Sequence, residues 1–169
     1  DLYFNQNPAV IPFLSERTRH EGNGLTPKSP FTQGSKMHIG DYLGRRTIYS
    51  PEALAIVDTG KTPELRLTYA QMNERANRLA NWLREAGVGK GDRVAMLALD
   101  GVEHLDVLFA CGKLGAIHTA LNWRLHWREL QLILADVTPT VLVYDDTFKD
   151  NVAQLAQGVR AGSRRESAA

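Results

Sequence analysis

Three glycines around one lysine, Gly87-Val-Gly-Lys-Gly91, form the first segment of this chain in which backbone amides could hold a phosphate. A P-loop needs a strand before it, a helix after it, and serine or threonine directly after the lysine. Here the segment follows a helical pattern and precedes an apolar run, and glycine stands after Lys90. The spacing also differs from Gly-x-Gly-x-x-Gly, the dinucleotide-binding fingerprint. We therefore interpret the segment as a helix-to-strand turn, because glycine often ends helices.

Side chains that bind metal ions are scattered along the sequence. The histidines stand at positions 20, 38, 104, 118 and 126, and none forms an i,i+4 pair with a suitable glutamate. Cys111 has no cysteine neighbour and lies in an apolar helical pattern, so we expect a small core residue. Asp100, Asp145 and Asp146 follow apolar runs, where a phospho-receiver would bind magnesium, but helix capping explains them more simply. We expect no metal site.

Composition narrows the class of partner. The 169 residues are 43% hydrophobic, enough for one domain with a core, and a formal net charge of +1 argues against a nucleic-acid partner. No apolar run has the length of a membrane span, and the first residues do not resemble a signal peptide. A single cysteine allows no internal disulfide, which suits a reducing compartment. We expect a cytoplasmic protein that binds a small molecule or another protein.

Residues 68–88 carry the strongest secondary-structure signal. Thr68, followed three residues later by Gln71, forms a capping box that satisfies free amides in the first turn of a helix. Apolar residues then recur at three-and-four spacing, the pattern of a helix with one buried face: Tyr69, Met72, Ala76, Leu79, Ala80, Leu83 and Ala86. Gly87 with Val88 supplies the helix end. This helix is predicted to be structural, since its buried face carries no nucleophile, base or metal ligand.

The remaining pattern predicts an α/β fold. Residues 54–57 and 65–67 are expected to be short strands joined as a hairpin. Beyond the long helix, apolar runs at 94–99, 116–121 and 141–144 alternate with helical patterns at 100–114, 125–134 and 148–155. Such alternation gives right-handed crossovers and a parallel sheet covered on both faces. We predict a doubly wound parallel sheet with a short N-terminal hairpin.

Two segments resemble the adenylate-forming enzymes, the family of AMP-binding acyl-CoA synthetases and ligases. The run from Leu67 to Asp92 is similar to the family's opening motif, in which a strand ending Leu-Thr-Tyr leads into a long helix that stops at Gly-Val. The run from Cys111 to Leu125 is similar to a family segment in which Lys-Leu-Gly-Ala leads to a strand and then Leu-Asn-x-Arg-Leu. The resemblance covers about residues 37–157 and corresponds to the first quarter or so of a family member.

The resemblance implies an activity for the whole protein: a carboxylic acid, commonly fatty or aromatic, reacts with ATP and Mg²⁺ to an acyl-adenylate and is then transferred to coenzyme A. The family uses a Ser/Thr/Gly-rich loop, a Tyr-Gly-x-Thr-Glu-like motif, a Thr-Gly-Asp motif and a lysine near the C-terminus. None of these motifs occurs in this chain. We therefore expect no catalytic residue and no bound cofactor in this chain, which resembles an acid-thiol ligase but would be inactive alone.

His118, Asn122 and Arg124 are candidates for the edge of a substrate pocket. They stand near the predicted carboxyl ends of strands, where ligands bind in open α/β sheets. In the simpler interpretation Asn122 only begins the turn into the next helix. The sequence His118-Thr119-Ala120 also departs from the small-apolar-proline sequence that is commoner in the family before Leu-Asn.

The sequence divides into an irregular or disordered extension (1–36), the α/β N-terminal portion of an AMP-binding domain (37–158) and a polar tail (159–169). Two hypotheses stay open: an N-terminal fragment of an acyl-CoA synthetase, or a stand-alone α/β binding or interaction module without catalysis. The strand at 94–99 and the helix at 102–114 are apolar on almost every side. We expect exposed apolar surface or an open strand edge, and with it self-association, dependence on a partner or marginal stability.

Overall fold

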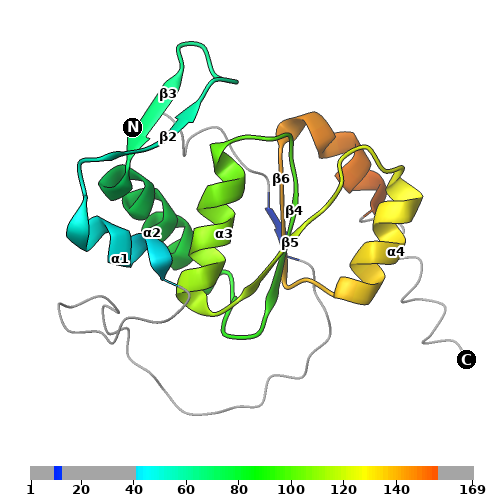
Figure 1. Ribbon diagram of the computed structural model, residues 1–169. Helices are drawn as coiled ribbons and strands as arrows, with labels where there is room; N and C mark the ends of the chain where they lie inside the picture. The colour runs from blue at the N-terminus through cyan, green and yellow to red at the C-terminus, as the bar shows by residue number, and fades with distance from the viewer. Residues whose placement is uncertain (1–9, 13–40, 156–169) are drawn as a thin grey trace, which may run out of the picture.

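The computed structural model describes residues 10–12 and 41–155, which form a sheet with helices on both faces (Figure 1). Helices α1 (Tyr42–Tyr49), α2 (Tyr69–Glu85) and α3 (Val102–Leu114) lie on one side of the sheet. Helix α4 (Trp127–Val137) and a helical segment over residues 149–155 lie on the other side. The expected extension and polar tail fall outside the described residues, except for residues 10–12.

Three strands of the sheet are parallel, which confirms the predicted α/β class. The central strand β4 (Arg93–Leu97) pairs with β5 (Ile117–Ala120) on one side and with β6 (Val141–Tyr144) on the other. A fourth strand, β1 (Val10–Pro12), pairs antiparallel with β6, so the order is β1-β6-β4-β5. Strand β1 lies in the segment expected to be irregular. It forms because backbone groups alone can extend a free sheet edge.

The hairpin precedes the sheet, as predicted. Strand β2 (Leu54–Asp58) pairs antiparallel with β3 (Leu65–Thr68), with a register shift between Leu54 and Ile56. Before it lies α1, a helix that we did not predict. The local signal was Asp41, whose carboxylate accepts a hydrogen bond from the Gly44 amide at 3.0 Å and so caps the helix.

Helix α2 begins and ends as the sequence predicts. The Thr68 hydroxyl accepts from the Gln71 amide, and the Gln71 side chain accepts from the Thr68 amide, so the capping box is complete. At the other end the amide of Val88 donates to the Leu83 carbonyl at 2.9 Å. Gly87 has φ +92°, a left-handed conformation, and Val88 is buried. The glycine-rich segment is therefore a helix-to-strand turn.

Helix α3 begins differently from the prediction. Asp100 is exposed, and Gly101 occupies the N-cap position without a side-chain cap of its own. The carboxylate of Asp58, at the end of β2, accepts a hydrogen bond from the Val102 amide at 3.1 Å. The capping role expected for Asp100 is therefore wrong, because a residue from the hairpin performs it. The prediction for Asp145 is confirmed, since its carboxylate accepts from the Thr147 amide and caps the 3₁₀ helix η1 (Asp146–Phe148).

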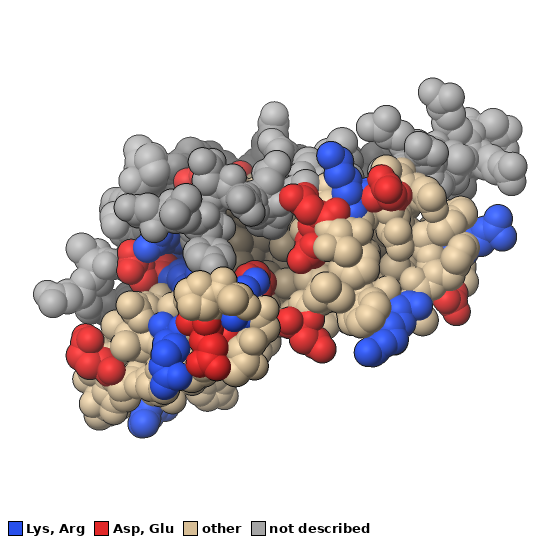
Figure 2. Space-filling model, turned by 90° about the horizontal axis from the view of Figure 1, so that it is seen from above, with Lys and Arg blue, Asp and Glu red and all other residues tan. Residues whose placement is uncertain are grey.

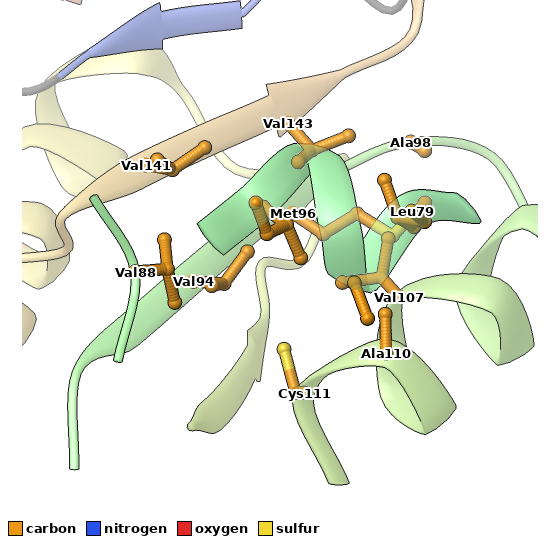
Figure 3. Packing of buried hydrophobic residues seen from close by; sticks show 12 residues of the cluster. Leu79, Val88, Val94, Met96, Ala98, Val107, Ala110, Cys111, Val141 and Val143 are labelled. Atoms are coloured by element: carbon orange, nitrogen blue, oxygen red, sulfur yellow. The ribbon is translucent and has the colours of Figure 1, made fainter. Parts of the chain in front are cut away.

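Two apolar clusters fill the space between the sheet and its covering helices. The first lies under α2 and α3 and includes Val94, Met96, Val107 and Cys111 (Figure 3). The second lies under α4 and residues 149–155 and includes Leu97, Leu130, Leu134 and Leu142. Because strand side chains alternate between faces, the almost wholly apolar strands β4 and β6 supply residues to both clusters.

Candidate functional site

The predicted pocket-edge residues Asn122 and Arg124 lie together in the loop between β5 and α4. The side-chain oxygen of Asn122 accepts a hydrogen bond from the Arg124 amide at 3.1 Å, which closes a tight turn. Both side chains are exposed. The guanidinium of Arg124 lies over the Trp123 ring at 4.5 Å, and Trp123 in turn contacts buried Phe148. The loop thus holds a cation in a defined place at the carboxyl end of β5.

The same loop continues into a second stack at the start of α4. The ring of His126 caps this helix by accepting a hydrogen bond from the Arg128 amide at 3.3 Å, and Glu129 completes the capping box. The Arg128 guanidinium lies 5.2 Å from the centre of the Trp127 ring. His126 therefore serves the helix start. The two exposed arginines could attract an anion or an aromatic group.

His118 occupies a different environment from Asn122 and Arg124. It lies within β5 opposite Val94, on the sheet face covered by α3. Its ring meets that of His104 from α3 edge to face, with ring centres 6.4 Å apart. The Nε2 atoms of both rings are buried, and neither has a hydrogen-bond partner among the described residues. Burial, and secondly the neighbouring His104, lowers the pKa of His118.

The structure therefore brings two of the three predicted site residues together. Asn122 and Arg124 share one turn, whereas His118 belongs to the contact between β5 and α3. Within residues 121–128 the side chains offer two guanidiniums, one amide, the imidazole that caps α4 and two tryptophan rings, but no serine, cysteine or carboxylate pair. This arrangement of cationic, amide and aromatic groups can help to bind a ligand.

A network of buried polar groups between α1, α2 and α3 was not predicted. The side chain of Lys113 is only 2% exposed. Its ammonium group donates hydrogen bonds to Asp41 Oδ1 at 2.8 Å and to Asn73 Oδ1 at 2.7 Å. A second ion pair joins α2 and α3, where Arg75 Nε lies 3.1 Å from each carboxylate oxygen of Asp106. The only sequence signal is the position of charged residues on otherwise buried helix faces. These pairs join three helices rather than form a binding site.

Burial and ion pairing act in opposite directions on Asp106. Desolvation raises the pKa of its carboxyl group, and the Arg75 guanidinium opposes that rise. Cys111 shows a simpler case. Its side chain is buried in the cluster under α3, and burial raises the pKa of the thiol to about 12. The thiol is therefore a core group, as expected from the sequence, and not a nucleophile.

Residues 10–12 and 41–155 show neither a metal-binding cluster nor a membrane-spanning helix. No group of three or more histidine, cysteine, aspartate or glutamate side chains in these ranges could hold a metal ion. Among the same residues, no helix combines the length and the apolar character needed to cross a bilayer. Figure 2 shows one face of the molecule, on which acidic and basic side chains are interspersed rather than gathered into a broad patch of one sign.

Comparison with known proteins places these observations in a family. A model of the AMP-binding enzyme family matches residues 45–167. A feruloyl-CoA synthase from Amycolatopsis sp is 43% identical over 120 residues, which are 71% of this chain and 24% of that protein. The long-chain-fatty-acid–CoA ligase FadD13 of Mycobacterium tuberculosis is 40% identical over 107 residues, 63% of this chain and 21% of the ligase. The chain thus spans about a quarter of the length of these curated relatives.

Solved structures agree with the sequence matches. The N-terminal domain of FACL13 from Mycobacterium tuberculosis, in an inhibitor-bound crystal structure, superposes with a TM-score of 0.63 at 37% identity, over 73% of this chain and 30% of that one. A putative long-chain-fatty-acid CoA ligase from Rhodopseudomonas palustris gives a TM-score of 0.66 at 31% identity, with the same coverage of both chains. Sequence and fold together show that this chain belongs to the AMP-binding enzymes, the adenylate-forming acyl-CoA ligase family.

Proposed function

We propose that this chain forms the N-terminal portion of an ATP-dependent acyl-CoA ligase of the cytoplasm. The whole protein would activate a carboxylic acid as its acyl-adenylate and pass the acyl group to the thiol of coenzyme A. The observation that supports this proposal most strongly is the family match over residues 45–167, together with the superposition on an N-terminal domain of the same family. The curated relatives act in this chemistry by name, as feruloyl-CoA synthase and fatty-acid–CoA ligase.

The described residues do not fit a complete site for ATP and Mg²⁺. They contain no carboxylate cluster for a metal ion, and the glycine-rich segment 87–91 is a turn between α2 and β4. Adenylate formation needs charged and polar groups arranged around the phosphates. Those groups would have to come from other parts of the whole protein. The proposed contribution of this chain is a scaffold and one edge of the substrate pocket.

Asn122 and Arg124 are the residues that we assign to this pocket edge. They are exposed at the carboxyl end of a parallel strand, where open α/β sheets bind ligands. The turn closed by Asn122 and the ring of Trp123 hold the Arg124 guanidinium in place. A fixed guanidinium at this position would favour an anionic substrate group. His118 would act more indirectly, by supporting β5 against α3.

The first experiment tests whether this chain is inactive without the rest of the proposed ligase. The purified chain is assayed for ATP–pyrophosphate exchange with ferulate and with fatty acids, in the presence of Mg²⁺. We expect no exchange above a no-protein control, because the phosphate-binding groups are absent from the described residues. Exchange by the chain alone, in a preparation free of host ligases, would contradict the proposal that other parts of the whole protein supply the phosphate-binding groups.

The second experiment tests the positive part of the proposal with a chimera. Residues 45–155 of this chain replace the matching segment of the feruloyl-CoA synthase, to which the chain is 43% identical. We expect ATP-dependent formation of the CoA thioester, because the replaced segment would supply an equivalent scaffold. A chimera that folds, as judged by circular dichroism and a monodisperse profile, but makes no thioester would refute the proposal.

Two arginine variants of the chimera then test the pocket edge. Arg124 and Arg128 are both exposed and both stack on a tryptophan, so Arg128→Ala is a matched control for Arg124→Ala. We expect Arg124→Ala to raise KM for the acid roughly tenfold, the effect of losing one charge-assisted contact. Arg128→Ala should change KM little. Equal effects of the two substitutions would contradict the assignment.

A further inference from the structure

The two edges of the sheet differ in how they are protected against further pairing. Among the described strands, β1 forms one edge and β5 the other. Strand β1 ends with Pro12, which has no amide hydrogen to donate and so interrupts any ladder on that side. Strand β5, with the sequence Ile-His-Thr-Ala, contains neither a proline nor a charged residue. Native edge strands commonly carry prolines or charged residues that block further pairing. Because β5 has none of these, it is an unprotected edge.

Backbone geometry determines which groups β5 offers at its open side. The amides of Ile117 and Leu121 donate to the Asp92 and Met96 carbonyls, so these positions point toward β4. In a parallel pair, alternate residues direct their amide and carbonyl groups to opposite sides. His118 and Ala120 therefore present theirs outward. Apolar surface lies at this edge, since the Ile117 side chain of β5 is 51% exposed.

We propose that β5 pairs antiparallel with β5 of a second copy of this chain, about a two-fold axis that passes between the two Thr119 residues. In this register His118 lies opposite Ala120 of the other copy, and each such pair exchanges two backbone hydrogen bonds. Thr119 faces its own counterpart as a non-hydrogen-bonded pair. The two three-stranded parallel sheets, each extended by β1, become one continuous sheet.

A second copy suits this edge for reasons of symmetry and charge. A two-fold axis makes the two strands identical in length and in the spacing of donors and acceptors, so every hydrogen bond forms twice. No charged side chain of β5 opposes the approach. The pairing uses only four residues from each chain, which places the interface in the small, weakly associating class. We therefore expect a reversible dimer rather than a permanent one.

Cysteine cross-linking tests both the contact and its register. The α carbons of a non-hydrogen-bonded antiparallel pair lie about 4.5 Å apart, within the range that a disulfide spans. Under mild oxidation Thr119→Cys should therefore yield a covalent dimer. Leu132→Cys on α4, at a position whose side chain is 74% exposed, is the control for random collision. The unmodified chain, whose single cysteine is buried, should remain uncrosslinked.

Sedimentation of charge variants gives a second measurement that does not depend on oxidation. Ala120→Lys adds a charge near the two-fold axis and should weaken association roughly tenfold, because like charges across a strand pair repel. Leu132→Lys adds the same charge on α4 and should leave association unchanged. Sedimentation is measured at chain concentrations from about 5 to about 500 µM, a range chosen to include the Kd of a weak interface of this size.

Three results would contradict the proposed pairing of the two β5 strands. A chain that stays monomeric throughout the concentration range would overturn the proposal. So would a dimer weakened by Leu132→Lys but not by Ala120→Lys, or equal cross-linking rates for Thr119→Cys and Leu132→Cys, since both results would place the contact elsewhere. Circular dichroism of every variant checks that the chain remains folded, so that a loss of pairing is not a loss of structure.

Discussion

Replacing Asp41 by asparagine should destabilise the fold strongly, although the substitution removes only one charge. Asp41 Oδ1 lies 2.8 Å from Lys113 Nζ, and the two side chains are 20% and 2% exposed. Asparagine can still cap α1, so the cap is retained. The Lys113 ammonium, however, would lose its counterion in a site that water hardly reaches. Removing one partner of a buried ion pair typically costs 3–5 kcal/mol, and we expect about 3 kcal/mol here.

The lower end of that range applies because Lys113 keeps a second partner. Asn73 Oδ1 lies 2.7 Å from the ammonium and would still accept a hydrogen bond. Lys113→Met removes the buried cation itself and leaves a partly solvated carboxylate, so we expect a loss of only about 1 kcal/mol. The double variant should resemble Lys113→Met, because the unpaired ammonium is gone. The cycle thus predicts a coupling of about 3 kcal/mol between the two residues.

Urea unfolding followed by circular dichroism and by tryptophan fluorescence measures these differences, provided that both signals give the same transition. A loss of about 3 kcal/mol corresponds to a fall in Tm of about 6–12 °C for a chain of this length. The reasoning is refuted if Asp41→Asn costs less than about 0.5 kcal/mol, the range of an ordinary surface substitution. It is equally refuted if the double variant is as unstable as the sum of the single ones.

Three further outcomes follow from the structure. Because folding lowers the pKa of His118, the folded chain binds fewer protons than the unfolded chain at a pH below the ordinary histidine pKa. The free energy of unfolding should therefore fall as the pH drops below about 6.5. This dependence on pH should be weaker in His118→Phe, and an unchanged dependence would exclude His118 as its source. The thiol of Cys111, with its pKa raised to about 12, should react with a thiol reagent at pH 8 only after denaturant is added; rapid reaction of the native chain would show that it is accessible. Asp58→Ala should cost about 1 kcal/mol by removing the cap of α3, whereas Asp100→Ala should stay within about 0.5 kcal/mol; the reverse order in urea unfolding would restore Asp100 as the cap.

Features set by neighbouring residues could be predicted from the sequence. The capping box of Thr68 and Gln71 and the left-handed end at Gly87 depend on residues within one turn of each other. The alternation of apolar runs with helical patterns likewise specified a parallel sheet, because strands buried on both faces need apolar residues throughout. Helix α1 has an equally local signal, because its cap Asp41 stands three residues before Gly44, from whose amide it accepts a hydrogen bond.

Features that depend on distant pairs could not be predicted in this way. Lys113 and Asp41 are separated by 72 positions, and nothing near either residue identifies the other as its partner. The same holds for the candidate site. Asn122 and Arg124 are close in sequence and proved to share a turn, but the contact of His118 with His104 required the packing of α3 on β5. Position along a strand does not specify which helix covers it.

The hydrogen bond from Val102 to Asp58 makes the capping of α3 depend on docking of the β2–β3 hairpin. Loop closure between positions 44 residues apart must precede the hydrogen bond to Val102, so the first turn of α3 lacks its cap until the hairpin has docked. Contacts of such long range usually form late, and they raise the contact order of an otherwise locally connected fold. Hydrogen exchange at the Val102 amide should therefore report opening of the hairpin, with a protection factor that follows the hairpin rather than the middle of the helix to which that amide belongs.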